Sequence, residues 1–171
     1  IPNTIDEKTV SSIGFNAFHY LTNLTSVIIP DSVTSIGSGA FELCSNLAGV
    51  TIGNSVDRIE AGAFHGCAIS NLMIPDSVTS IGSEAFLSCQ LTRVTIPKNV
   101  ASIGYYAFGS RSLIAITVDA LNSFFCSVDG VLFNKSQTTL VQYPGGKAGS
   151  YTISNSVTII GDSAFYGCAG L

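Results

Sequence analysis

The side chains that could bind a metal ion are few in this sequence. Of its 171 residues only two are histidines, His19 and His65, and each directly follows a phenylalanine. Glu42 also follows a phenylalanine and lies between them in the sequence. If these three side chains lie in one exposed column, their nitrogen and oxygen atoms could bind zinc. The alternative is a pair of opposite surface charges, which stabilises a protein little.

Five cysteines form a second candidate group. Cys44, Cys67, Cys89 and Cys168 each lie three residues after a phenylalanine, and the sequence has no Cys-x-x-Cys spacing of the kind found in zinc sites. The equal spacing predicts that these four thiols stack in the interior, where a free cysteine packs as a small apolar side chain. Disulfides and a bound metal are the alternatives, and Cys126 falls outside the pattern.

Catalytic motifs are absent from the sequence. Nothing directs His19 or His65 toward a particular serine, and serines are abundant at predicted turns. The stretch Gly145-Gly146-Lys147 lacks the spacing of a phosphate-binding loop and the Ser or Thr that follows it. We therefore predict a protein that is not an enzyme and that needs no cofactor.

The phenylalanines that precede these groups belong to a repeat. The motif Ile-Gly-x-x-Ala-Phe occurs six times, once with Glu60 in place of glycine, and its phenylalanines are 23, 23, 22, 22 and 57 residues apart. A second motif, Leu-x-x-Val-x-Ile, precedes the first, as in residues 24–29 and 91–96. Its last apolar residue lies 12 residues before the next phenylalanine. A constant period of this length predicts a solenoid in which each repeat forms one coil.

Residues 74–91 read Ile-Pro-Asp-Ser-Val-Thr-Ser-Ile-Gly-Ser-Glu-Ala-Phe-Leu-Ser-Cys-Gln-Leu, and they resemble the repeat of the BspA-like leucine-rich repeat family. The resemblance covers nearly the whole chain. Leu21 and Arg111 stand where other repeats have cysteine, and residues 119–148 depart from the pattern. The resemblance implies a secreted, surface-displayed module for adhesion and virulence, of the kind found in oral and gut bacteria and in some mucosal protozoa.

The expected fold is a leucine-rich-repeat solenoid, a right-handed α/β-type superhelix built mainly from parallel β coils of 22–23 residues. Each Leu-x-x-Val-x-Ile segment should form a short strand with these three residues pointing inward, and the coils should stack at about 4.8 Å. Residues 83–86 predict a short helical turn. Little α-helix is expected, because 22 residues must also hold two extended segments.

Two kinds of residue should fix how the coils stack. The repeat glycines, such as Gly37, Gly82, Gly104 and Gly161, supply either a positive φ or a close approach between coils. The six repeat phenylalanines should form one buried stack. They are Phe18, Phe41, Phe64, Phe86, Phe108 and Phe165.

Residues 119–148 predict one enlarged repeat inside a single domain of about six repeats that spans residues 1–171. Residues 124–128 and 131–133 flank Asp129-Gly130, which is a strong signal for a two-residue β-hairpin. Leu140–Pro144 predicts a further strand. The segment is either a recognition protrusion or a structural elaboration of one coil. Because the chain begins at Ile1 and ends within a repeat, we expect a fragment of a longer array.

Composition argues against two classes of partner. No apolar run approaches the ~18 residues of a membrane-spanning helix, so membrane insertion is not expected. The net charge is −4, and the seven Lys and Arg residues occur singly, which argues against a nucleic-acid partner. Neither end carries a polar cap, so end-to-end self-association is expected.

The outward positions of the predicted strands form the candidate binding surface. Stacking aligns two columns, Ser26, Gly49, Asn71, Arg93, Ala115 and Ile28, Thr51, Met73, Thr95, Thr117. Small polar groups with Ile28 and Met73 as apolar anchors and Arg93 as the only cation suit a broad ligand. We expect a host cell-surface or extracellular-matrix protein, or a glycan, to bind Ser26, Ile28, Thr51, Asn71, Met73, Arg93, Thr95 and Thr117. The alternatives are a solvated sheet face in a structural spacer and an intracellular scaffold.

Overall fold

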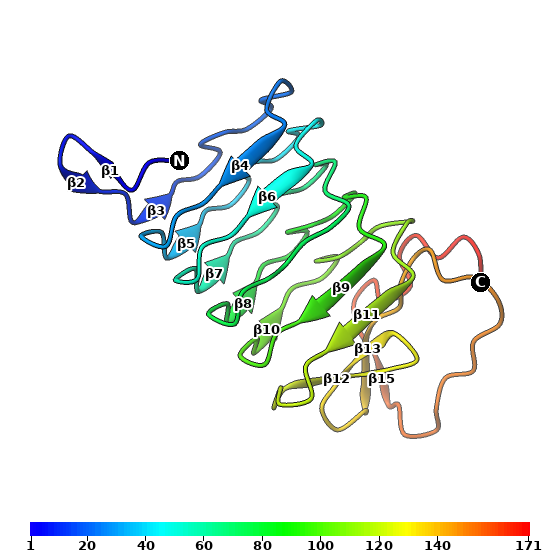
Figure 1. The fold of residues 1–171 in the computed structure, drawn as a ribbon. Coiled ribbons are helices and arrows are strands. Elements are labelled where there is room, and N and C mark those ends of the chain that lie inside the picture. Colours follow the sequence, from blue (N-terminus) through cyan, green and yellow to red (C-terminus); the bar gives the residue numbers. More distant parts are fainter.

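The computed structural model describes all residues from 1 to 171, and it contains strands and turns but no helix. The coils lie side by side from the N-terminus to the C-terminus and form one elongated stack (Figure 1). No segment is therefore a helix with the length and apolar character needed to cross a bilayer. The strands are β1 (Thr4–Ile5), β2 (Lys8–Thr9), β3 (Ser12–Ile13), β4 (Ser26–Ile28), β5 (Ser35–Ile36), β6 (Gly49–Thr51), β7 (Arg58–Ile59), β8 (Ser80–Ile81), β9 (Arg93–Ile96), β10 (Ser102–Ile103), β11 (Ala115–Val118), β12 (Phe125–Val128), β13 (Val131–Asn134), β14 (Thr139–Gln142) and β15 (Ile159–Ile160).

The two extended segments of each repeat form two separate series of parallel strands. The second segments form a continuous five-stranded sheet in the order β3-β5-β7-β8-β10. Equivalent residues pair in this sheet, so Ile36 lies between Ile13 and Ile59. The Leu-x-x-Val-x-Ile segments form only the two pairs β4–β6 and β9–β11. Because equivalent residues of successive coils pair, their side chains lie in columns along the stack.

Two of the predicted Leu-x-x-Val-x-Ile strands do not form. Residues 70–74 and 149–153 contain no strand, so the prediction of a strand in every copy is wrong. No backbone N–H or C=O of residues 68–74 takes part in a backbone–backbone hydrogen bond. In this copy Leu72 replaces the β-branched valine, and Asn71 and Met73 flank it, so its preference for a strand is weak.

The turn before each phenylalanine is not helical. Glu84 has a φ of 60°, and the equivalent residue of the other coils is also left-handed. A left-handed residue ends a right-handed helix. In addition, the Phe86 N–H donates to Ala107 O of the next coil at 2.8 Å, whereas the Ala85 N–H bonds within the turn. The predicted α/β-type superhelix with short helical turns is therefore wrong, and the fold is a β-solenoid of stacked parallel coils.

The glycine of the motif is required by a close approach between coils. A Cβ atom at Gly82 would lie 2.4 Å from Ala61 N, and one at Gly104 would lie 2.3 Å from Ser83 N. Neither glycine has a positive φ. At Gly14, in the first coil, an added Cβ would meet nothing within 4 Å. The motif glycine therefore matters only where another coil stacks against it.

Five phenylalanines form a continuous aromatic stack through the core. Consecutive ring centroids are 5.0, 5.2, 5.4 and 5.5 Å apart, and the rings are parallel within 5°. The rings of Phe41, Phe64, Phe86 and Phe108 are fully buried. The four buried rings belong to a single cluster of 31 buried apolar residues, and the partly buried Phe18 packs against it. Each coil thus covers an aromatic ring that it could not bury alone.

Tyr143 supplies the aromatic ring of the enlarged repeat. Its side chain is 1% exposed and its ring stacks on Phe165 at 5.3 Å. Its N–H donates to Ala164 O at 2.7 Å, which is the bond that Phe41 makes to Ala63 O in a regular coil. Phe165 therefore packs on a tyrosine and not on a phenylalanine, contrary to the prediction of one stack of six phenylalanines.

The enlarged repeat has its own sheet and a small core. β12 and β13 form an antiparallel hairpin around Asp129-Gly130, and β14 pairs with β13 and with β15. Asn122, which is 1% exposed, attaches this region to the preceding coils. Its Nδ2 donates to Pro97 O at 2.8 Å and to Val100 O at 2.9 Å, and its Oδ1 accepts from two backbone N–H groups at 2.8 Å. The second core consists of Val131, Phe133, Leu140, Tyr143 and Ala164.

Candidate functional site

The predicted binding residues lie on one surface, which we call the strand face. It consists of the outward side chains of β4, β6, residues 71–73, β9 and β11. Inward valines such as Val27 and Val94 are buried and hold these strands on the core. Pairing aligns Ser26 with Gly49, Ile28 with Thr51, Arg93 with Ala115, and Thr95 with Thr117. The strands therefore align the predicted columns within each of the two pairs.

Asn71 and Met73 lie between the two strand pairs and belong to neither. Met73 is 85% exposed and Ile28 is 66% exposed, so both apolar anchors are available to a partner. A hollow of about 580 Å³ lies beside Met73, lined by residues 50–52, Asn54 and residues 73–76. The surface is thus two short sheets separated by an irregular, hollowed segment, and not the continuous sheet that the sequence predicted.

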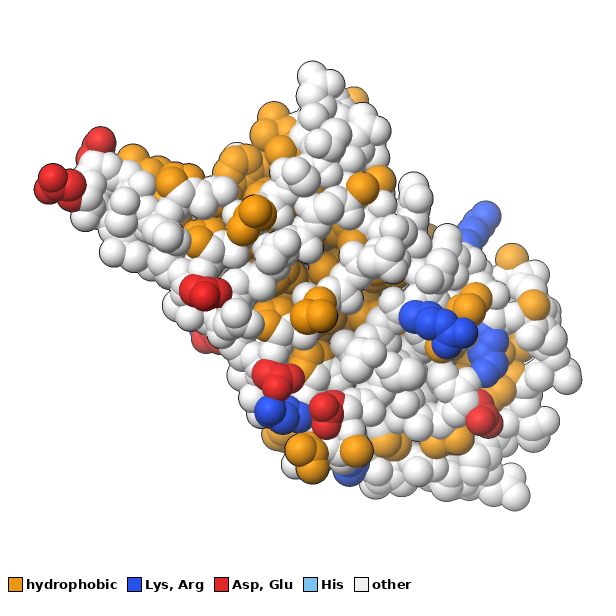
Figure 2. Space-filling model, viewed as in Figure 1, with side chains coloured by type: hydrophobic (Ala, Val, Ile, Leu, Met, Phe, Trp, Pro, Cys, Tyr) orange, Lys and Arg blue, Asp and Glu red, His pale blue; other side chains and the backbone are white.

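The strand face carries little charge. Arg93 is the only charged residue among the ten positions of the two columns. The hydroxyls of Thr95 and Thr117 lie 2.8 Å apart and form a hydrogen bond. At the rim, Lys98 Nζ lies 2.6 Å from Asp76 Oδ2, and this hydrogen bond raises the pKa of Lys98. Figure 2 shows apolar and uncharged atoms across most of this side, with Lys or Arg side chains in its right half and a group of charged side chains toward its lower left.

The histidines and Glu42 do not form a three-residue cluster. His65 Nδ1 lies 3.2 Å from Glu42 Oε1, and both side chains are partly exposed. The ring of His19 lies beside Tyr20, with ring centroids 6.2 Å apart. No group of three or more His, Cys, Asp and Glu side chains is placed to hold a metal ion. Of the two arrangements predicted from the sequence, the structure contains the surface pair of Glu42 and His65 and not a three-residue zinc site.

The repeat cysteines form a column of free thiols. Cys44, Cys67 and Cys89 are buried, and none of the five cysteines is in a disulfide. The thiols of Cys44, Cys67 and Cys89 donate to phenylalanine carbonyls of the preceding coil at 3.0, 3.1 and 3.2 Å. Burial raises the pKa of Cys89 to about 12 and also raises the pKa of Cys67. Such thiols are poor nucleophiles and poor metal ligands.

In the coil of Phe108 the position of the buried thiol is taken by Ser110. Its side chain is buried, and its hydroxyl donates to Cys89 O at 2.6 Å. Arg111 is exposed instead. Arg111 has the three-residue spacing of the cysteines from the phenylalanine, but the side chain that is buried in this coil is that of Ser110, one residue earlier.

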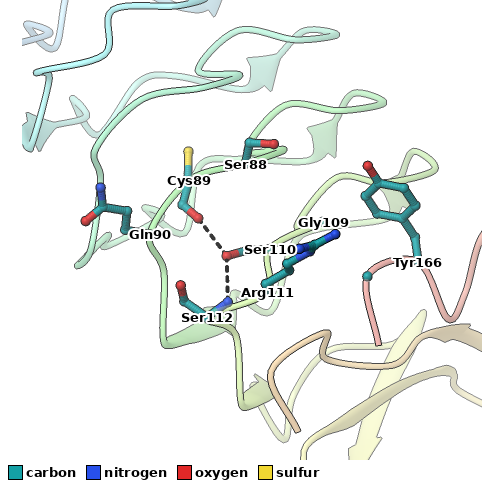
Figure 3. Close-up of a pocket in the computed structure, with 9 residues that line it drawn as sticks. Ser88, Cys89, Gln90, Gly109, Ser110, Arg111, Ser112 and Tyr166 are labelled. Atoms are coloured by element: carbon teal, nitrogen blue, oxygen red, sulfur yellow. Dashed lines mark hydrogen bonds between the residues drawn. The ribbon is translucent and has the colours of Figure 1, made fainter. Parts of the chain in front are cut away.

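A polar hollow of about 260 Å³ adjoins Ser110 (Figure 3). Its lining comes from three coils and includes Gln90, Ser110, Arg111 and Tyr166. The Arg111 side chain extends toward Tyr166, and Gln90 lies on the opposite side (Figure 3). The Ser110 hydroxyl also accepts a hydrogen bond from the Ser112 N–H at 3.2 Å. No histidine lines this hollow, so its serines lack the general base that a nucleophilic serine needs.

Sequence reasoning missed both Tyr143 and this hollow. A signal for Tyr143 exists, because Tyr143 precedes Phe165 by 22 residues, which is one repeat period. No comparable signal indicates the hollow, because it forms between coils that are distant in sequence.

Comparisons with known proteins agree with this architecture. The sequence profile of the family described as BspA type leucine rich repeat region matches six copies, over residues 7–139 and 143–171. A comparison with curated proteins gives no significant match.

Several solved structures are similar to the chain. A leucine-rich repeat protein from Eubacterium ventriosum has a TM-score of 0.83 and 31% identity over 95% of this chain and 50% of that one. The pneumococcal vaccine antigen PcpA has a TM-score of 0.73 and 26% identity over 96% of this chain and 51% of that one. A leucine rich cell surface protein from Faecalibacterium prausnitzii has a TM-score of 0.58 and 29% identity over 100% of this chain and 61% of that one.

The chain spans about half the length of the first two of these proteins. The family profile covers almost all of the chain. The repeated phenylalanine is explained by the stacked coils, because each coil buries it in the common core. The chain belongs to the BspA-type leucine-rich repeat family.

Proposed function

We propose that the protein is a non-catalytic module that binds a partner protein through the strand face. The observation that carries this proposal is the interruption of the sheet beside Met73. There the backbone polar groups of residues 68–74 make no backbone–backbone hydrogen bonds, and a hollow adjoins an apolar side chain that is 85% exposed. Unpaired backbone donors and acceptors beside an apolar anchor offer a partner both hydrogen bonds and buried area.

The chemistry of the surrounding columns fits a protein partner of broad contact area. Ile28 and Met73 would occupy apolar sockets of the partner, and Arg93 would pair with a carboxylate. The threonine hydroxyls would form a polar surround. A nearly uncharged face costs little desolvation when a partner covers it, because few ions lose their water.

We place the partner outside the cell, as a host cell-surface or extracellular-matrix protein. Two of the similar structures support this, since one is described as a vaccine antigen and another as a cell surface protein. A glycan on such a protein is an alternative ligand for the same face.

The test is binding to immobilised collagen, laminin and fibronectin, measured by biolayer interferometry. Met73→Glu should weaken binding at least tenfold, because it puts a charge on the apolar anchor. Ala101→Glu is the matched control, since Ala101 is exposed on the segment leading into β10 and away from the strand face. Val128→Glu, on the β12–β13 hairpin, tests the hairpin as a recognition protrusion. Loss of binding with Val128→Glu but not with Met73→Glu would move the site to the hairpin.

We also propose that the two ends of the solenoid associate with each other in solution. At the first coil, a hollow of about 630 Å³ is lined mostly by apolar residues, among them Ile5, Val10 and Phe18. In the last coil, Ile159 and Ile160 are more than half exposed. Apolar surfaces at both ends of a repeat stack favour contact between the end of one copy and the beginning of another.

A further inference from the structure

The enlarged repeat lacks part of the turn that every regular coil has. In the regular coils the strand isoleucine and the stacked phenylalanine are five residues apart, as with Ile103 and Phe108. In the enlarged repeat Leu140 pairs with Ile160 of the next coil, and the stacked aromatic residue is Tyr143, only three residues later. The missing two residues leave a notch between the turns of the coils on either side.

The notch is a hollow of about 220 Å³. Residues 103–106 and 161–163 form its two walls, and Thr139, Val141 and Gln142 form its floor. The ring of Tyr106 meets that of Tyr166 edge to face, with centroids 4.6 Å apart. Tyr166 also lines the polar hollow of Figure 3, so the two hollows lie on either side of this aromatic pair.

Gln142 is an unpaired amide at the floor of the notch. Its residue is 7% exposed, and its side chain makes no hydrogen bond within the protein. The buried side-chain polar atoms without a hydrogen-bond partner are Ser32 Oγ and Asp57 Oδ1 alone, so the Gln142 amide still reaches the solvent of the notch, where a ligand can contact it. A side-chain amide both donates and accepts. The group that best satisfies Gln142 is therefore one with a donor and an acceptor side by side.

Unpaired backbone donors of the coil before the notch add to this polarity. In the preceding coil the N–H groups of Glu84 and Ser88 donate to Tyr105 O and Gly109 O of the next coil at 2.9 and 2.8 Å. The equivalent N–H groups of Tyr106 and Ser110 donate to no backbone carbonyl. Because equivalent groups point toward the following coil, the Tyr106 N–H is directed toward the notch, which Tyr106 lines, whereas Ser110 lines the adjoining hollow of Figure 3.

We propose that this notch binds a saccharide that carries an acetamido group. The acetamido N–H and C=O would pair with the Gln142 amide, and the apolar face of the sugar ring would pack on the exposed rings of Tyr105 and Tyr166, each 52% exposed. Asp162, the only charged residue in the lining, would accept hydrogen bonds from sugar hydroxyls. The hollow is smaller than the ~300–1,000 Å³ of typical ligand pockets. This size suits one sugar ring, with the next sugar ring of the saccharide in the adjoining hollow.

A peptide ligand fits the notch less well. The walls offer backbone atoms, hydroxyls and tyrosine rings, and they contain no deep apolar socket for a side-chain anchor. The site is separate from the strand face, so it does not depend on the function proposed above.

The test is a titration with N,N′-diacetylchitobiose, followed by amide chemical shifts, with cellobiose as the matched disaccharide that lacks acetamido groups. Shifts are expected at Tyr106, Ser110 and Asp162, with a Kd on the order of 1 mM. Gln142→Leu should weaken binding at least tenfold while the melting temperature stays the same or rises, because the Gln142 amide makes no hydrogen bond within the protein that the substitution could remove. Tyr166→Ala should also weaken binding, whereas Met73→Glu should leave it unchanged.

Three results would overturn the proposal. They are the absence of shifts with N,N′-diacetylchitobiose, equal binding of cellobiose, and unchanged binding by a folded Gln142→Leu variant. The unchanged or raised melting temperature of that variant separates a lost ligand contact from a damaged fold.

Discussion

The regular coils before residue 114 and the region from Asp119 onward are built from the same repeat but stabilise themselves differently. In the regular coils Phe41, Phe64 and Phe86 each lie between two nearly parallel rings. Every motif glycine after the first lies against the preceding coil. In the later region an antiparallel hairpin interrupts the stack, and Tyr143 and Phe165 meet at an angle of 26°. A core of five buried residues replaces one of 31.

The regular coils supply most of the stability, whereas the candidate binding surfaces lie at the irregular places. Stacked identical coils pair one another's backbone N–H and C=O groups. The regular coils therefore have few unpaired hydrogen-bonding groups to offer a ligand. Both candidate surfaces occur where the repeat fails: the strand face at residues 68–74, where the sheet is interrupted, and the notch at Gln142, where the turn is short. We therefore expect the interruptions of the repeat, and not the regular coils, to be where the solenoid binds other molecules.

Removing one stacked ring from each region tests whether the two regions differ in stability. Phe64→Ala should lower the free energy of unfolding by on the order of 3 to 5 kcal/mol, because the ring is fully buried between two others. Phe165→Ala should cost less than about 2 kcal/mol, since that ring is partly exposed. Urea denaturation measures both. Equal losses would show that the two regions share one core.

A second substitution tests how the regions are joined. Asn122→Ala removes two hydrogen bonds to the regular coils and two to the start of the hairpin, and it should cost about 2 to 4 kcal/mol. We expect the amides of β12 and β13 to exchange with solvent faster than those of β5 and β7 in this variant. Uniform acceleration in all four strands would mean that the molecule unfolds as one unit.

Much of the regular part could be predicted from the sequence because each repeat corroborates the next. The positions of Phe41, Phe64 and Phe86 at a fixed distance from the preceding strand determine both the stack and the inward side of the strands. The absence of helix could not be predicted this way. Glu84 is left-handed in a turn whose Glu84 and Phe86 N–H groups donate to carbonyls of the next coil, and no local preference of these residues indicates that arrangement.

The candidate sites were harder to predict for the same reason. Exposure of Ile28, Met73 and Arg93 followed from alternation along the strands, but the interruption of the sheet between them depends on how two coils meet. Gln142 gives no signal in the sequence, because its position in the notch results from two residues that the repeat lacks. A pattern predicts what every repeat shares and says little about a single exception.

Thiol chemistry should distinguish the two regions. Cys44, Cys67 and Cys89 are buried in the regular coils, whereas Cys126 and Cys168 are partly exposed. Iodoacetamide at pH 8, followed by mass spectrometry, should label the last two much faster than the first three. Equal labelling of all five in the folded protein would contradict the buried column.

The same thiols predict how stability depends on pH. Burial raises the pKa of Cys89 to about 12, so the folded protein keeps this proton above the pH of about 8.5 at which an unfolded thiol loses it. The contribution of this thiol is fully present below pH 8.5, and it should fall by about 1 kcal/mol between pH 8.5 and 9.5. A Cys67→Ala, Cys89→Ala variant should show a shallower decline. An identical slope would assign the decline to other groups.

The smallest expected effect on stability concerns the motif glycine at the start of the stack. Gly82→Ala should cost about 2 kcal/mol or more, because its Cβ would lie 2.4 Å from a backbone nitrogen of the neighbouring coil and the coils would have to separate. Gly14→Ala should change the free energy of unfolding by less than about 0.5 kcal/mol, because nothing lies within 4 Å of the added atom.

If two copies join end to end, however, Gly14 packs against the last coil of the other copy, as Gly82 packs against its neighbouring coil. Sedimentation velocity should then show concentration-dependent association of the wild type and only monomer for Gly14→Ala, at unchanged stability. Association that persists in the variant would mean that the copies meet through another surface.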